Sequence, residues 1–173
     1  MAMNQQARRV IRVTPTVTGV TYANNDILFD TTEVPLAVGK KGECSKLVSA
    51  MIVSKSNSLC DIELFFCQVN QSVGTVNAAR NVSDADFATA KVLGRITLDS
   101  SADNYNYGGG RVHNFDRQSE TYETTDQWKS RFPLLLQAAS GTTSVFCFAF
   151  ISGTDVTPDF SVGDIELVLG VEY

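Results

Sequence analysis

Histidine and cysteine, the residue types most often used for catalysis and metal binding, are few in this chain and widely spaced. His113 is the only histidine, and its surroundings form no metal-binding motif, so a metal site or a catalytic triad would have to be assembled from distant loops. The chain also lacks the phosphate-binding loop, the dinucleotide-binding glycine motif and the nucleophile elbow. We therefore expect that the protein is not an enzyme, that no residue is catalytic and that no cofactor is bound.

The acidic residues have simpler interpretations than catalysis. Asp84 and Asp86 suit the first turn of a helix, where carboxylates interact favourably with the helix dipole. Asp155, Asp159 and Asp164 could converge on calcium, which takes several oxygen ligands from one loop region, but they lack the spacing of an EF-hand. The expectation from spacing is that no metal is bound, with calcium at this loop as the alternative.

The four cysteines, at positions 44, 60, 67 and 147, have neither the short paired spacing of a zinc site nor the pattern of a disulfide framework. We expect buried, reduced thiols, since free cysteine is among the most buried residue types. If Cys60 and Cys67 share a strand, their odd separation directs them to opposite faces.

Composition limits the class of protein. The 173 residues are enough for one domain, and 43% hydrophobic with 19% charged residues is typical of a globular chain with an ordinary core. A net charge of -5 argues against non-specific nucleic-acid binding, which depends on Lys and Arg. No apolar run is long enough to span a membrane, and residues 1–12 lack the apolar region of a secretion signal. We expect a chain that contacts neither nucleic acid nor membrane and stays where it is made.

The elements that position these residues read mainly as strands. In residues 165–172 apolar side chains alternate with others, the period of a strand with one buried face. Residues 144–151 carry Phe146, Phe148 and Phe150 on one side and apolar residues on the other, which predicts a central strand. Residues 47–54 are interpreted as a strand buried on both faces, joined by a hairpin turn at Asn57-Ser58 to a strand in residues 60–69.

The remaining segments complete an all-β prediction. Ser83 and Asp86 resemble a capping box that begins a short helix over residues 84–90. Residues 1–8 are expected to be a flexible arm, and residues 9–173 a single domain with a long loop insertion at residues 99–129. Roughly eight strands with one short helix predict an antiparallel β-sandwich.

Several segments, in order, resemble a family of structural proteins encoded close to the capsid genes of tailed bacteriophages. They are residues 13–16 (VTPT), 21–26 (TYANND), 52–57 (IVSKSN), 61–66 (DIELFF), 83–86 (SDAD), 92–94 (VLG) with Ile96, 134–142 (LLLQAASGT) and the closing strand, residues 163–173. The resemblance implies a jelly-roll-like sandwich that forms a homotrimer and decorates, or cements, the outer surface of an icosahedral head. Its implied partners are the major capsid protein and further copies of itself, and its implied location is the virion, after synthesis in the bacterial cytoplasm.

Residues 99–129 depart from the family, because the segment is longer there. It concentrates Tyr105, Tyr107, Tyr122 and Trp128, residue types that are enriched at interface hot spots. Together with Arg8 and Arg9 of the arm, these are the candidate interface residues. The alternatives are a tail or baseplate component and a carbohydrate-binding adsorption module, with a hydrolase on the same fold as a weaker third.

Overall fold

The chain forms an antiparallel β-sandwich in the computed structural model, which describes residues 7–100, 104–115, 132–152 and 158–173. Every strand pairing in these residues is antiparallel, so the all-β sandwich is confirmed. The strands are β1 (Arg8–Val13), β2 (Val20–Thr21), β3 (Ile27–Val34), β4 (Cys44–Ser54), β5 (Asp61–Cys67), β6 (Val92–Leu98), β7 (Asn104–Asn106), β8 (Arg111–Asn114), β9 (Leu134–Gln137), β10 (Val145–Ser152), β11 (Asp159–Phe160) and β12 (Ile165–Glu172). The described helix is α1 (Asp84–Ala90).

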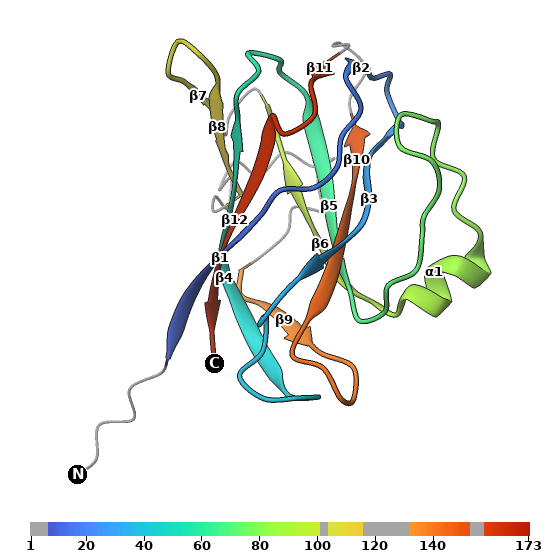
Figure 1. The fold of residues 1–173 in the computed structure, drawn as a ribbon, viewed down its shortest axis with the longest axis vertical. Coiled ribbons are helices and arrows are strands. Elements are labelled where there is room, and N and C mark those ends of the chain that lie inside the picture. Colours follow the sequence, from blue (N-terminus) through green and yellow to red (C-terminus); the bar gives the residue numbers. More distant parts are fainter. Residues whose placement is uncertain (1–6, 101–103, 116–131, 153–157) are drawn as a thin grey trace, which may run out of the picture.

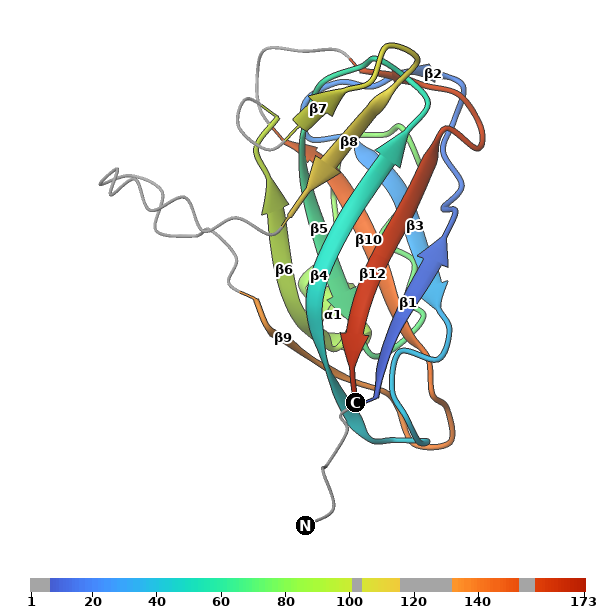
Figure 2. The same cartoon turned by 90° about the vertical axis from the view of Figure 1, so that its left-hand side faces the viewer.

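Two large sheets pack face to face (Figure 1). The six-stranded sheet has the order β1-β12-β4-β8-β7, with β9 also paired to β4. The four-stranded sheet has the order β3-β10-β5-β6, and β11 pairs with β2 in a small third sheet. The six-stranded sheet faces the reader in Figure 2, with the four-stranded sheet and α1 behind it.

Most strand pairs join the first half of the chain to the second half. The outermost strands in sequence, β1 and β12, pair with each other, as do β3 with β10, β4 with β8 and β9, and β5 with β6. In each of these pairs a strand from the first half of the chain lies beside a strand from the second half, so each half of the sequence supplies strands to both sheets.

The core between the sheets comes from the alternation seen in the sequence. The inward residues of β12, and those of β10 opposite, are all buried; they are Ile165, Leu167, Leu169 and Val171, and Val145, Cys147, Ala149 and Ile151. Each sheet contributes one apolar face, and burial of these faces against each other is the main stabilising term of such a sandwich.

A second cluster covers the outer face of the four-stranded sheet. Phe148 and Phe150 of β10 project there beside Phe65 of β5, and Phe65 and Phe148 stack with centroids 5.1 Å apart. Phe87 of α1 packs edge-on against both of these rings. The predicted central strand is thus confirmed, since β10 is buried on both faces.

Helix α1 begins where the capping box predicts. The backbone N–H of Asp86 donates to Ser83 Oγ at 3.1 Å, and the Ser83 hydroxyl donates to Asp86 Oδ2 at 2.6 Å. The helix ends at Lys91, whose φ of 51° is left-handed. This short helix places Phe87 and Ala90 over the phenylalanine cluster.

The expectation that β4 is buried on both faces is wrong. The register with β12 shifts between Gly170 and Val171, so that Val48 is an extra residue in β4. This bulge reverses the alternation, and Leu47 therefore faces the core together with Ala50 and Ile52. The residues on the other side are partly or fully exposed, so β4 has one buried face.

The predicted hairpin at Asn57-Ser58 is also wrong, because β4 and β5 lie in different sheets. The connection is a corner held by serine hydroxyls. Ser58 N–H donates to Ser56 Oγ at 3.0 Å, and the hydroxyls of Ser56 and Ser58 donate to the carbonyl of Asp159 at 2.8 and 2.9 Å. These contacts fix the corner to β11 while Cys60 enters the core.

Two boundaries also change. The arm expected over residues 1–8 ends earlier, because Arg8 already pairs with Glu172 in the sheet. The loop insertion expected over residues 99–129 contains β7 and β8, which extend the six-stranded sheet beside β4. Strand β3 is eight residues long and lies at the edge of the four-stranded sheet.

Replacing Phe148 with alanine should destabilise the fold by about 3–5 kcal/mol, since it removes a fully buried ring that stacks on Phe65. Denaturant titration measures this loss. Tyr105→Ala, which truncates a largely exposed ring, is the matched control and should change stability by less than about 1 kcal/mol. A similar small effect for Phe148→Ala would show that the cluster contributes little.

Candidate functional site

Arg8 and Arg9 lie in β1, at the end of the sandwich where β12 ends (Figure 2). Arg8 Nε contacts Glu172 Oε2 at 3.0 Å, and the backbone N–H of Tyr173 donates to the carbonyl of Ala7 at 2.9 Å. Both arginine side chains are exposed, but that of Arg8 is already paired within the chain. These residues belong to a paired strand and not to an arm.

Tyr105 and Tyr107 lie on the β7–β8 hairpin at the opposite end (Figure 1). The Tyr107 hydroxyl donates to the carbonyl of Ser54 at 2.9 Å, which ties the hairpin tip to β4. A Cβ on Gly110 would collide with the Ser54 carbonyl and the Tyr107 ring, so glycine is needed there. Tyr105 is 70% exposed and makes the hairpin a candidate contact surface.

The structure separates the candidate interface residues into two groups. Strand β4 runs from one group to the other, since its Lys46 lies beside Glu172 and its Ser54 lies beside Arg111 of the β7–β8 hairpin. Eight residues at about 3.3 Å each put the two ends roughly 25 Å apart. The other two candidates, Tyr122 and Trp128, lie outside the described residues. Arg8 and Arg9 therefore do not form one site with the tyrosines.

The sequence analysis missed a third surface, the outer face of the six-stranded sheet. We call it the outer patch and define it by its apolar side chains, Val10, Met51, Val53, Val112, Leu135 and Val168. Val10 and Leu135 are 65% and 59% exposed, and the other four are partly exposed. The signal was present in the apolar residues on both sides of β4, but was interpreted as burial.

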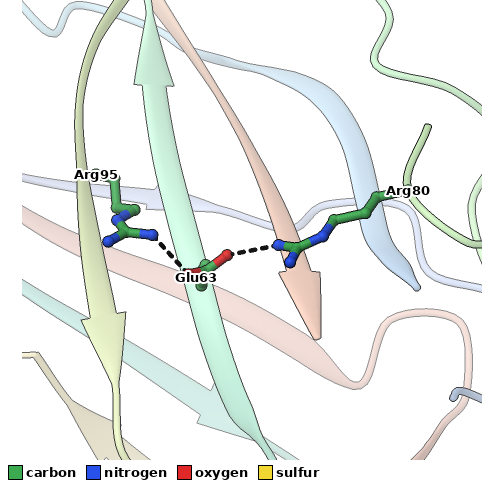
Figure 3. A network of polar contacts seen from close by, with 3 residues as sticks. All are labelled: Glu63, Arg80 and Arg95. Carbon is green, nitrogen blue, oxygen red and sulfur yellow. Dashed lines mark hydrogen bonds and ion pairs between the residues drawn. The ribbon is translucent and has the colours of Figure 1, made fainter. Parts of the chain in front are cut away.

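Charged side chains cover part of the outer face of the four-stranded sheet. Glu63 of β5 bridges Arg80 and Arg95, at 2.9 and 2.6 Å (Figure 3). The same guanidinium groups lie 5.7 Å from the centroid of the Phe150 ring and 6.0 Å from that of Phe65, respectively. Cation–π contacts and a shared carboxylate hold both arginines against the phenylalanine cluster, so their role is structural.

His113 faces the core from β8 and is only 2% exposed. Burial, with a smaller contribution from the positive charge of Arg111, lowers the pKa of His113 to about 4. Its Nδ1 has no hydrogen-bond partner in the described part of the chain. The ring is thus neutral at pH 7, and a catalytic role would require a route for substrate into the core.

The described residues contain no group of three or more His, Cys, Asp or Glu side chains placed to hold a metal ion. In the calcium candidate, the Asp164 carboxylate accepts from the backbone N–H of Ser161 at 2.7 Å, and Asp155 lies outside the described residues. Nor is any helix in the described ranges long and apolar enough to cross a membrane.

All four cysteines are free thiols, as expected, but the expectation that all are buried is wrong for Cys44. Cys44 begins β4 at the exposed end of the sheet. Burial raises the pKa of Cys60 and of Cys67 to about 12, and burial also raises the pKa of Cys147. Cys60 and Cys67 belong to different clusters, consistent with opposite faces.

Comparisons with protein-family models, curated proteins and solved structures found no match to this chain.

Alkylation of the native protein should modify Cys44 quickly and leave Cys60, Cys67 and Cys147 unmodified, because burial keeps those three thiols protonated and inaccessible. Intact-mass measurement counts the added groups, and all four thiols should react after unfolding without reductant. The Cys44→Ser variant is the control and should gain no group in the native state. Rapid native modification of that variant would contradict the burial of the other three.

Acid should destabilise the protein through His113. Because its folded pKa of about 4 lies below its ordinary 6.5, the unfolded chain binds a proton between these values that the folded chain does not. Stability is complete above about pH 6.5 and falls as pH decreases toward 4, by up to about 3 kcal/mol. His113→Leu should lose less stability over this interval in denaturant titrations, and equal losses would refute the assignment.

Proposed function

We propose that this chain is a structural protein of tailed-bacteriophage virions, a decoration or cement protein that binds the outer surface of the capsid. The observation that carries the proposal is where the resembling segments fall. Residues 61–66 lie in β5, residues 92–94 in β6, residues 83–86 at the start of α1, and residues 163–173 contain β12. They make up the framework of the sandwich, so the resemblance concerns the architecture.

The strand pairing supports the finer, jelly-roll interpretation. A jelly roll is a long antiparallel hairpin wound into two four-stranded sheets, a fold used by viral capsid proteins among others. Here β1, β3, β4 and β5 pair in turn with β12, β10, β8 and β6, which is the order that such winding produces. Fold alone does not define function, so the proposal also rests on the exposed surfaces.

The proposed mechanism is binding. Each copy contacts adjacent subunits of the major capsid protein, and a ligand that binds only the assembled shell shifts the equilibrium toward it. Association of copies, as a homotrimer, adds multivalency. The chain would be made in the host cytoplasm and reside on the outside of the virion.

We assign shell contact to the β7–β8 hairpin end. Tyr105 offers a largely exposed aromatic ring there, and tyrosine is enriched among interface hot spots. Arg8, at the other end, is paired with Glu172 and would lose that contact on binding elsewhere. The proposal thus narrows the two expected attachment regions to one.

Tyr105→Ala should weaken binding to purified heads of the encoding phage by roughly 30-fold, the effect of losing about 2 kcal/mol at a hot spot. Quantitative mass spectrometry of co-sedimented heads measures the occupancy. Arg9→Ala, at the opposite end, is the matched control and should bind like the wild type. The oligomeric state of each variant is measured first, so that a change in self-association is not mistaken for a change in shell binding.

Equal occupancy for Tyr105→Ala and wild type would refute the assignment of the hairpin end. A wild-type chain that never co-sediments with heads would refute decoration altogether.

The exposure of Tyr105 also favours the second candidate, a carbohydrate-binding module, since exposed aromatic rings can stack on sugars. Heads and purified host glycans, offered separately, distinguish the two. Binding to glycans but not to heads would select the adsorption module.

A further inference from the structure

The outer patch differs from what an exposed antiparallel sheet usually presents. Such a sheet packs one face on the core and turns a polar face to water. Here the central outward positions of β4, β8 and β12 are Met51, Val53, Val112 and Val168, all apolar. No described element lies over them, whereas α1 covers the other sheet (Figures 1 and 2). An uncovered apolar surface with a polar rim is typical of an interface.

We propose that the outer patch is a self-association interface, and that it is covered by a second copy of this chain related by an axis that runs along the strands. The inference deepens the self-association part of the proposed function and rests on it. It assigns to that association a face and an orientation.

The charges on the rim select the orientation. Outward residues at one height form rows across the sheet, in which Arg12, Val168, Met51 and Asn114 are one row. Arg8, Glu172, Lys46 and Leu135 are another.

An axis along the strands keeps each residue at its own height and reverses the order across the sheet. Val168 then lies opposite Met51 of the second copy, and Glu172 lies opposite its Lys46. The first contact joins apolar side chains and the second joins opposite charges, with Glu172 itself only 9% exposed and also paired with Arg8 of its own chain. In the row of Glu166, Val53 and Val112, the same axis sets Glu166 opposite Val53.

An axis across the strands keeps the order of the strands and reverses the heights, because each strand then faces the same strand of the second copy in the antiparallel direction. That arrangement sets Arg8 of β1 against Arg12, or Glu166 of β12 against Glu172. Like charges placed opposite one another disfavour an interface. The rim therefore favours the axis along the strands.

The outer face of the six-stranded sheet is large enough for a specific interface. Four strands about 4.8 Å apart, and a height of about 25 Å, give roughly 500 Å² on each copy. Two copies would then bury about 1,000 Å², the lower bound for a specific interface. Both lateral flanks are also apolar, with Val10 on β1 and Leu135 on β9 each more than half exposed.

The first test is the solution mass of the purified chain by light scattering over a concentration series. The wild type should have a mass of at least twice the 18.8 kDa of one chain. Met51→Lys and Val168→Lys should reduce it to that of one chain, because each places a charge in the apolar centre. Val162→Lys is the control, since this valine is 74% exposed and lies outside the outer patch, and it should retain the wild-type mass.

Leu135→Lys is a lysine variant of the outer patch that should fold normally, because this side chain is already 59% exposed and its replacement leaves the core intact. Circular dichroism confirms the fold of each variant. A monomeric wild type, or lysine variants that keep the wild-type mass, would overturn the proposal.

The second test addresses orientation with the charges of two different chains. Lys46→Glu alone and Glu172→Lys alone should each be monomeric, since Glu172 would face glutamate in the first and Lys46 would face lysine in the second. An equal mixture should associate, because each contact then joins opposite charges. Residues 46 and 172 of one chain still carry the same charge in each variant, so an ion pair within one chain cannot explain association of the mixture. A mixture that stays monomeric would refute the axis.

These measurements use the chain alone, and occupancy on heads is measured separately. A monomeric wild type that still binds heads would remove this inference and leave shell binding standing. An oligomer that forms through the outer patch but never binds heads would do the reverse.

Discussion

Burial of β10 on both faces is the constraint on which the rest of the structure depends. Its inward residues pack against the six-stranded sheet, and its outward rings, Phe148 and Phe150, require a cover of their own. Helix α1 and the shared contacts of Glu63 supply that cover. Three layers therefore meet at one strand, with α1 packed on the outer face of the four-stranded sheet.

The six-stranded sheet lacks such a cover in the described residues. Where β12 and β4 meet, Gly170 leaves room for the Ser49 hydroxyl, since a Cβ there would collide with Ser49 Oγ. Next to this glycine the apolar side chains of Val168 and Met51 are left partly exposed. This partly apolar centre lies between the Arg12–Glu166 and Arg8–Glu172 ion pairs.

The sequence predicts this fold well where the reasons are local. The alternation of apolar residues in β12 and β10 depends only on the two-residue period of a strand. The Ser83 cap of α1 depends only on a few neighbouring residues. The failures share a non-local cause. The bulge at Val48 becomes visible only through the register with Gly170, and the corner at Ser56 depends on the distant carbonyl of Asp159. The outer patch was missed for the same reason, because an apolar side chain facing outward and one facing the core look alike until the second sheet is in place.

Self-association and shell binding also constrain each other. Copies related by an axis along the strands all turn the same end in the same direction, so Tyr105 of every copy would lie on one side of the assembly and Arg9 of every copy on the other. Since these ends are roughly 25 Å apart, a nearly flat shell can meet only one of them. Under the two proposals together, every copy would bind through the same contact at once, and the strength of attachment would come from the number of hairpins that bind together and not from the affinity of any single one.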